Sequence, residues 1–314
     1  MLLARSKTIV RTNLGTLHHI SRRNIAQIAT LKSWQLQGFR EQAFEPELPI
    51  VLPHSAEHTP LACKRWFNTC RPSLKDEADV ASAPTQLNRG YFAPYENVVV
   101  PLEITQRSSE SCSHVKFEKI EAPLRLLLDD LSSVSDQSTS IYLAQHDIRD
   151  LPKQLQDDLR MPSLVAAAGK GDVYSSSLWI GKAPTYTPLH RDPNPNLFVQ
   201  IAGVKSIRMF RPEVGSAVFD LTQRLLQDKN QNSSSQSSAF RGHEMMGGPE
   251  RQLLHDLVWT KPNQVDEQYA DRILQHAYDA TLQPGEALFI PKGWWHSVVG
   301  VGDDITASAN WWFR

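Results

Sequence analysis

The sequence predicts a mainly β protein with flanking helices, in which short strands form a sandwich or a closed barrel. From residue 161 to the end, short apolar segments alternate with glycine and proline turn signals, as in SSLWI, LFVQIAG, KSIRMF, EALFIP and ITASANWWF. Many short strands at such spacing are typical of sandwiches and barrels. The chain has 314 residues, of which 40% are hydrophobic, so it can bury a sizeable core.

Helices and single strands precede this β-rich part. Apolar residues recur at helical spacing between residues 32 and 44, and residues 49–52 form a short apolar run that indicates a strand. Further along, the pattern predicts a strand at residues 98–104 and helical segments around residues 124–128 and 151–159.

These elements divide the chain into a support and a barrel. We expect residues 31–139 to supply helices and strands that support the barrel, and residues 140–314 to form it. The polar run DKNQNSSSQSS, at about residues 228–240, is low in complexity and predicts a disordered surface insertion. Because strand patterns resume after it, we interpret it as a loop within one barrel.

Charge and cysteine content exclude several classes of protein. There are 33 basic and 34 acidic residues, for a net charge of -1, so no global field draws the chain to a membrane surface or to nucleic acid. No apolar run reaches the roughly 18 residues of a membrane span. The three cysteines lack CxxC spacing, which argues against a disulfide scaffold and a structural zinc cluster.

The amino terminus differs from the rest in composition. Seven basic residues precede the first acidic residue, Glu41, among many hydroxyl residues. This composition is typical of a mitochondrial transit peptide, which we place at residues 1–30. The alternative is a disordered basic tail or a start codon placed too far upstream, with the protein in the cytoplasm or nucleus.

One histidine has a carboxylate two positions later, in TPLHRDPNPN. On an extended segment residues i and i+2 project from the same face, so His190 and Asp192 can reach one metal ion together. Such a pair is common by chance and would, taken singly, indicate a surface loop. A metal site needs a third ligand.

His296 provides that ligand, in ALFIPKGWWHSVVG, where an apolar strand, a turn and two tryptophans precede it. Alone it would be a core histidine beside aromatic residues. Two histidines and one carboxylate on one face of an octahedron leave three positions open, as in non-haem iron(II) oxygenases. A zinc hydrolase would also accept these ligands.

A lysine in the predicted barrel distinguishes these possibilities. In KSIRMF, Lys205 shares strand parity with two apolar residues, so we expect it to face the interior, where a buried ammonium needs an anionic partner. The distal carboxylate of 2-oxoglutarate would be that partner, and Thr187 could add a hydroxyl donor. Thr306, Ser308 and Asn310 alternate along one face of the last strand. The alternative is that Lys205 reaches solvent and this polar row faces outward.

The segments SIYLAQHDI, SSLWIGKAPTYTPLHRDPNPNLFVQIAGVKSIRMFRP, PGEALFIPKGWWHSV and ASANWWF together resemble the small JmjC protein hydroxylases. This cupin-fold group includes the asparaginyl hydroxylase called factor inhibiting HIF and the JmjC arginyl hydroxylases, and it implies a double-stranded β-helix, or jelly-roll barrel. The resemblance covers most of residues 140–314 and, more loosely, the chain from about residue 33. It combines the HxD pair, the lysine fifteen residues later and the distal histidine.

The resemblance implies a role for individual residues. His190, Asp192 and His296 match the iron ligands, and Trp179 matches an aromatic residue that lines the pocket. Glu103, in VVVPLEIT, lies where the arginyl hydroxylases carry an acid that grips the substrate. The residues that match 2-oxoglutarate contacts are Tyr142, Thr187, Asn196, Lys205 and Asn310. The basic amino terminus and the serine-rich insertion depart from the family pattern.

The activity implied is that of an iron(II)- and 2-oxoglutarate-dependent dioxygenase that hydroxylates a protein side chain with O2 and releases succinate and CO2. One alternative is a JmjC lysine demethylase, and a second is a non-catalytic cupin that binds a ligand or partner. The absence of a zinc-finger or chromatin-reader pattern favours hydroxylation. The expected partner is a protein or peptide substrate, and the oligomeric state is left open.

Overall fold

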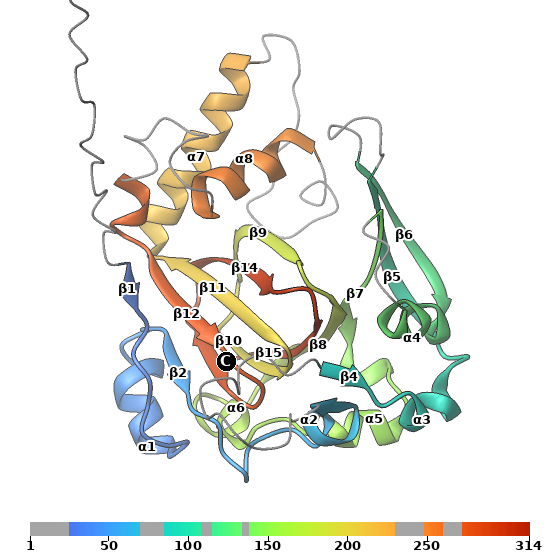
Figure 1. The fold of residues 1–314 in the computed structure, drawn as a ribbon. Helices are drawn as coiled ribbons and strands as arrows, with labels where there is room; N and C mark the ends of the chain where they lie inside the picture. The colour runs from blue at the N-terminus through green and yellow to red at the C-terminus, as the bar shows by residue number, and fades with distance from the viewer. Residues whose placement is uncertain (1–24, 70–84, 108–114, 134–137, 230–247, 260–271) are drawn as a thin grey trace, which may run out of the picture.

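The computed structural model describes residues 25–69, 85–107, 115–133, 138–229, 248–259 and 272–314 (Figure 1). Two large sheets dominate it. The five-stranded sheet has the order β1 (Ala26–Gln27), β12 (Tyr278–Leu282), β11 (Val204–Phe210), β14 (Trp295–Val301) and β9 (Tyr186–Arg191). The eight-stranded sheet has the order β2 (Ile50–Leu52), β13 (Ala287–Ile290), β10 (Asn196–Ala202), β15 (Ile305–Phe313), β8 (Val173–Lys182), β7 (Thr139–Asp147), β5 (Val99–Arg107) and β6 (Val115–Pro123).

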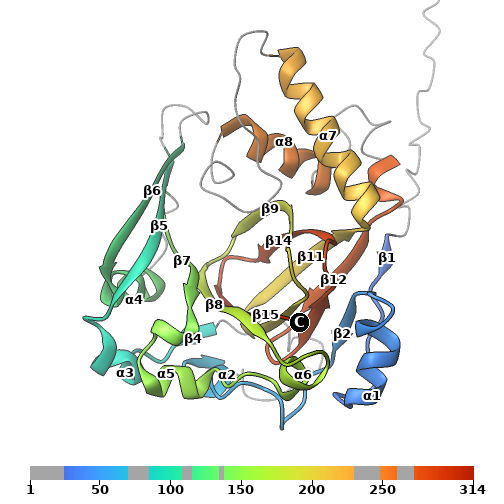
Figure 2. The same cartoon turned by 180° about the vertical axis from the view of Figure 1, so that it is seen from behind.

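The two sheets form the walls of a barrel, and β5 and β6 extend from it as an arm (Figures 1 and 2). Pairing is antiparallel except between β1 and β12. A separate two-stranded sheet joins β3 (Phe67–Thr69) and β4 (Thr85–Leu87). This arrangement confirms the predicted fold class and the predicted strands near residues 50 and 100.

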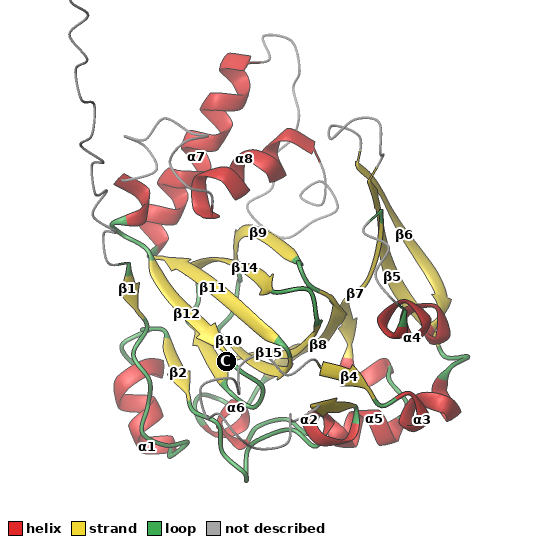
Figure 3. Ribbon diagram, in the orientation of Figure 1, coloured by secondary structure: helices red, strands yellow, loops and turns green. Residues whose placement is uncertain are grey.

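Short helices cover the outer face of the eight-stranded sheet (Figure 3). Phe39, Trp66 and Leu127 pack there with strand residues such as Phe289 and Phe313, and all five are almost fully buried. Burial of apolar surface of this kind is the main stabilising contribution in the chain. The helices are α1 (Leu36–Phe39), which continues as a π-helical turn (Arg40–Phe44), α2 (Ala62–Arg65), α3 (Arg89–Phe92), α4 (Leu124–Ser132), α5 (Lys153–Asp158) and α6 (Ser163–Ala167).

Two longer helices, α7 (Pro212–Lys229) and α8 (Gly248–Trp259), cover the outer face of the five-stranded sheet. Gly215 lets α7 approach closely, because a Cβ atom there would lie 2.1 Å from Trp295 Cγ. The sequence pattern predicted neither helix, and only a disordered insertion at about residues 228–240 was expected here. Residues 228 and 229 belong to α7, and the rest of the expected loop lies outside the described residues.

The fold begins earlier than the sequence analysis placed it. Residues 26 and 27 form β1 against β12, Ile28 is 8% exposed among residues of the barrel interior, and Leu31 is buried under the larger sheet. Residues 25–30 are therefore part of the barrel, and the expected boundary at residue 30 falls too late. The boundary is earlier because burial of Ile28 and Leu31 suffices to anchor a short edge strand at the end of a basic segment. Residues 1–24 lie outside the described residues.

Within the part of the chain that the structure describes, no helix is both long enough and apolar enough to span a membrane.

A candidate metal and co-substrate site in the barrel

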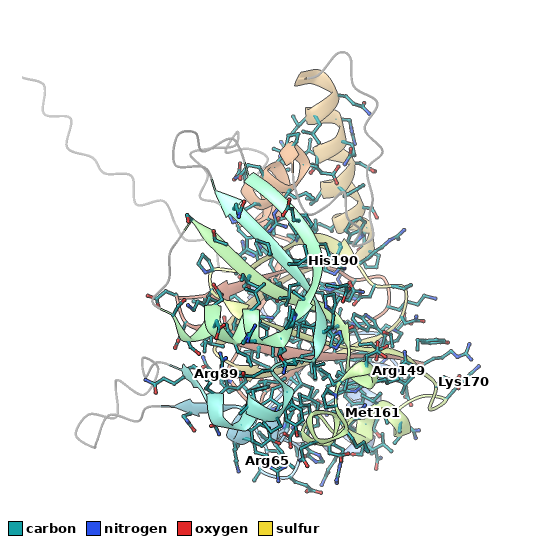
Figure 4. All side chains as sticks on the ribbon, turned by 90° about the vertical axis from the view of Figure 1, so that its right-hand side faces the viewer. Arg65, Arg89, Arg149, Met161, Lys170 and His190 are labelled. Atoms are coloured by element: carbon teal, nitrogen blue, oxygen red, sulfur yellow. The ribbon has the colours of Figure 1, made fainter. Side chains whose placement is uncertain are left out.

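The three predicted ligands meet inside the barrel. His190 is the last residue but one of β9 and His296 is the second residue of β14, and the two are direct cross-strand partners with ring centres 4.2 Å apart. Asp192 follows β9, with its carboxylate oxygens 4.0 Å from His190 Nε2 and 3.7 Å from His296 Nε2. All three side chains are buried, and their ligand atoms lie within 4.8 Å of one another. Figure 4 labels His190 among the barrel strands.

Backbone carbonyls orient both imidazole rings. His190 Nδ1 lies 2.8 Å from the carbonyl of Pro188, and His296 Nδ1 lies 3.2 Å from the carbonyl of Trp294. A carbonyl only accepts hydrogen bonds, so each Nδ1 is a donor, and each Nε2 is left to face the other two ligands. Orientation of this kind is common around metal-binding histidines.

A chain of two amides orients the carboxylate. Asn196 Nδ2 donates to Asp192 Oδ2 at 2.8 Å, and Asn310 Nδ2 donates to Asn196 Oδ1 at 3.0 Å. The carboxylate accepts only, which fixes the direction of both bonds. Asn310 Oδ1 is left as a buried acceptor without a hydrogen-bond partner in the described part of the chain, as is common where a water or ligand binds. Asn196 and Asn310 therefore lie beside the metal ligands.

An irregularity in the pairing of β9 turns Thr187, a further predicted site residue, toward the barrel interior. His190 pairs with His296, but Thr187 pairs with Val298, so Pro188 and Leu189 together lie opposite Ser297 alone. This extra residue is a β-bulge, and it reverses the alternation of side chains. Val298 packs in the interior cluster, so its partner Thr187 also faces the interior, although three residues separate it from His190.

Lys205 faces the interior, as its strand parity predicted. It is 2% exposed, and its Nζ donates to Ser308 Oγ at 2.7 Å and to Tyr142 OH at 3.4 Å. The ring of Phe198 lies 5.4 Å from Nζ. The alternative in which Lys205 reaches solvent is wrong. An outward polar row is wrong too, because Ser308 bonds to the inward Lys205, and Thr306 and Asn310 share its strand parity.

The wall beside Lys205 is formed by aligned residues of four strands. Glu103, Tyr142, Gly181 and Thr306 are successive cross-strand partners from β5 to β15, so their side chains share the interior face. A Cβ atom at residue 181 would lie 2.3 Å from Tyr142 Cδ2, so only glycine leaves room for that ring. Lys205, Tyr142 and Ser308 form one corner of the barrel interior, here called the co-substrate corner. Glu103 is buried next to Tyr142, at the edge of this corner.

Trp179 completes this corner. It pairs with Ser308 across β8 and β15, and its ring centre lies 6.3 Å from that of Tyr142. The structure thus brings every predicted site residue to the interior face of one barrel. Sequence reasoning gave no role to Ser308, although it noted the residue, and it missed Gly181, whose importance depends on a three-dimensional approach.

The residues fit the groups that the sequence predicts. Two imidazoles and one carboxylate place their ligand atoms within 4.8 Å of one another, which suits a divalent transition metal. A buried ammonium with two hydroxyl groups around it suits a carboxylate of a small ligand.

Comparison with known proteins agrees with this geometry. The family model described as "Cupin-like domain" matches residues 37–314. The chain is similar to "Lysine-specific demethylase JMJ30" of Arabidopsis thaliana, with 25% identity over 88% of this chain and 52% of that protein. It is 24% identical to "Lysine-specific demethylase 8" of Xenopus tropicalis over 88% of this chain and 51% of that protein.

A third relative extends the match. "Jumonji C domain-containing protein 5" of Drosophila melanogaster is 24% identical over 95% of this chain and 63% of that protein. The chain spans about half the length of the first two relatives. Because the family model covers most of the chain and the relatives carry JmjC names, the chain belongs to the JmjC group of the cupin-like domain family.

Proposed function

We propose that this chain is an iron(II)- and 2-oxoglutarate-dependent oxygenase that acts on a protein side chain. The observation that carries the proposal is the position of Lys205 in the same barrel as the three ligands. A dicarboxylate co-substrate needs a cationic partner, and the buried ammonium held by Ser308 and Tyr142 supplies one, which favours an oxygenase over a zinc hydrolase.

His190, Asp192 and His296 would hold the metal, and the side-chain set leaves positions open for other ligands. When they are bound, iron(II), 2-oxoglutarate and O2 would supply the oxidising chemistry. This chemistry yields succinate and CO2 and converts one substrate C–H bond to C–OH. No side-chain general base is required for this reaction.

The side chains of the barrel would bind 2-oxoglutarate and orient the metal ligands. Lys205 would bind the distal carboxylate of 2-oxoglutarate, with Ser308 and Tyr142 holding the ammonium in place and Thr187 adding a hydroxyl donor. Asn196 keeps the Asp192 carboxylate aimed at the metal. Apolar residues such as Phe198 and Trp179 border the co-substrate corner, and their low polarity strengthens the charge-assisted bond to Lys205.

Two outcomes for the substrate share this chemistry. Oxidation of a side-chain carbon leaves a stable hydroxyl group, whereas oxidation of an N-methyl group leads to loss of the methyl. The sequence favours hydroxylation, and the names of two relatives support demethylation at least as well. In either case, the resemblance to the arginyl hydroxylases gives Glu103, a buried acid on the interior face, a contact with the target side chain.

Mass spectrometry of candidate peptides incubated with the iron-loaded enzyme tests the proposal. Gain of one oxygen atom assigns hydroxylation, and loss of a methyl group assigns demethylation. A chain that retains iron fully but never consumes 2-oxoglutarate would instead be a non-catalytic cupin.

A further inference from the structure

The bulge in β9 determines which side chains enter the site. Thr187, His190 and Asp192 are spaced by three residues and then by two, and a regular strand cannot turn all three to one side. The bulge at Pro188 and Leu189 resolves this conflict. Proline suits such a position because it has no N–H group to contribute to the ladder.

The residue opposite the bulge holds it through its hydroxyl group. Ser297 Oγ donates to the backbone carbonyl of Thr187 at 2.8 Å and accepts from Trp259 Nε1 at 2.8 Å. The directions are fixed, because an indole N–H only donates and a carbonyl only accepts. Ser297 is fully buried, so both bonds lie where their loss is costly.

Trp259 is the last residue of α8, and it is held firmly in turn. The guanidinium of Arg208 lies 4.7 Å from its ring centre and donates to the carbonyl of Val258 at 2.5 Å. Two further bonds, of 2.8 and 2.6 Å, join Arg208 to Asp279 on β12. Trp259 is therefore held to the sheet by Arg208 of β11 on its ring and by Ser297 of β14 at its N–H group.

The same helix also binds β9 directly, on the amino-terminal side of the bulge. Arg251 Nη2 donates to the carbonyl of Tyr186 at 2.8 Å, and its guanidinium lies 4.6 Å from the Tyr186 ring centre. Figures 1 and 2 both show α8 beside β9. Helix α8 thus contacts β9 at Tyr186, before the bulge, and reaches Thr187 through Ser297.

We propose that Trp259 and Ser297 are positioning residues that hold the β9 bulge and thereby keep Thr187 turned into the co-substrate corner. Neither residue touches the predicted metal or 2-oxoglutarate. Loss of the indole N–H frees the Ser297 hydroxyl to rotate, and the Thr187 carbonyl then loses a fixed donor. The consequence for 2-oxoglutarate rests on the proposed function, whereas the consequence for the backbone of β9 does not.

The test uses Trp259→Phe, which keeps an aromatic ring, and Ser297→Ala, with the double variant. Trp34→Phe is a matched control, because Trp34 Nε1 donates to the carbonyl of Pro53 at 2.7 Å, away from β9. Three quantities are measured in the full chain: Mn(II) affinity, 2-oxoglutarate affinity by calorimetry with Mn(II) present, and hydrogen–deuterium exchange of residues 186–192.

We expect Trp259→Phe to raise the Kd for 2-oxoglutarate about 2- to 13-fold, the range for loss of one hydrogen bond, with little change in Mn(II) affinity. Ser297→Ala should do at least as much, and the double variant should be no worse than Ser297→Ala, because both changes break one relay. Exchange at residues 186–192 should accelerate in all three variants and stay unchanged in Trp34→Phe.

Exchange and 2-oxoglutarate affinity that match those of Trp34→Phe would overturn the proposal, as would strictly additive effects. If the wild-type chain binds no 2-oxoglutarate, the proposed function fails, and the exchange rates alone still decide whether the relay holds the bulge.

Discussion

The outer and inner faces of the eight-stranded sheet are both buried, but the inner face also carries polar groups. Strand β15 contributes to both: Ala307, Ala309, Trp311 and Phe313 pack outward in the large apolar core, while Thr306, Ser308 and Asn310 line the barrel. The outer face gains stability from apolar burial, whereas burial of polar groups on the inner face has a cost in stability. The difference separates residues that hold the fold from residues that perform its chemistry.

The largest expected effect is the loss of activity without loss of the fold when a predicted metal ligand on the inner side is substituted. We expect His190→Ala, Asp192→Ala or His296→Ala each to abolish 2-oxoglutarate turnover while the circular dichroism spectrum stays close to wild type. A succinate assay measures the loss. Wild-type turnover in any one variant would remove that residue from the ligand set.

The matched change on the outer face is Phe313→Ala. Phe313 is fully buried, with its ring centre 5.9 Å from that of Phe44 and 6.3 Å from that of Phe289. Truncation should reduce the free energy of unfolding by about 3–5 kcal/mol, measured by urea denaturation, while folded protein still binds 2-oxoglutarate. A variant that keeps its stability but loses co-substrate binding would contradict the division of roles.

Lys205→Ala tests the inner face with a smaller effect. A charge-assisted hydrogen bond to a carboxylate is worth roughly 1.5–3 kcal/mol, so the Kd for 2-oxoglutarate should rise about 10- to 150-fold with little change in iron affinity. Lys205→Arg should also bind poorly, because a planar guanidinium does not fit a corner shaped around an ammonium. An unchanged Kd in both variants would exclude the clamp.

Gly181→Ala tests the corner indirectly. The new methyl group would displace the Tyr142 ring and weaken its hydroxyl contact with Lys205. We expect the Kd for 2-oxoglutarate to rise about 2- to 13-fold, close to the effect of Tyr142→Phe. Gly90→Ala is the control, since its nearest atom would lie 3.9 Å from the new Cβ. Equal affinities in Gly181→Ala and Gly90→Ala would contradict the contact.

His146, on the outer face of β7, gives the smallest predicted effect. Burial lowers the pKa of His146, and the charges of Asp150, Asp147 and Glu121 only partly oppose this. As the pH falls, His146 therefore takes up a proton in the unfolded chain before it does so in the folded chain. The free energy of unfolding should decrease as the pH drops below about 6.5. His146→Phe should flatten this decline in urea titrations at several pH values, and a decline as steep as that of the wild type would contradict the prediction.

Strand parity and motif spacing predicted most of the site. The HxD pair and the inward side of Lys205 followed from alternation along strands, and His296 followed from its motif; the structure brings the three ligands together and turns Lys205 inward. The bulge at Pro188 was not predicted, although a proline within a strand is a usable sign of one. Alternation alone would have turned Thr187 away from His190.

Other features depend on approaches between distant parts of the chain. The need for glycine at 181 and 215 comes from the rings of Tyr142 and Trp295, which no local pattern indicates. Helices α7 and α8 lie next to a polar insertion, and the relay from Trp259 to Ser297 joins residues 38 positions apart. Ile28 anchors β1 within a segment whose basic composition predicted a transit peptide.

The buried triad and Lys205 are proposed to form one oxygenase site. The most direct test loads the full chain with iron(II), confirms the metal content, and measures succinate formed from 2-oxoglutarate under O2. We expect iron-dependent succinate formation in the wild type and loss of it in Lys205→Ala at 2-oxoglutarate concentrations that support the wild type. Full iron occupancy without succinate from the wild-type chain, with or without candidate peptides, would contradict it.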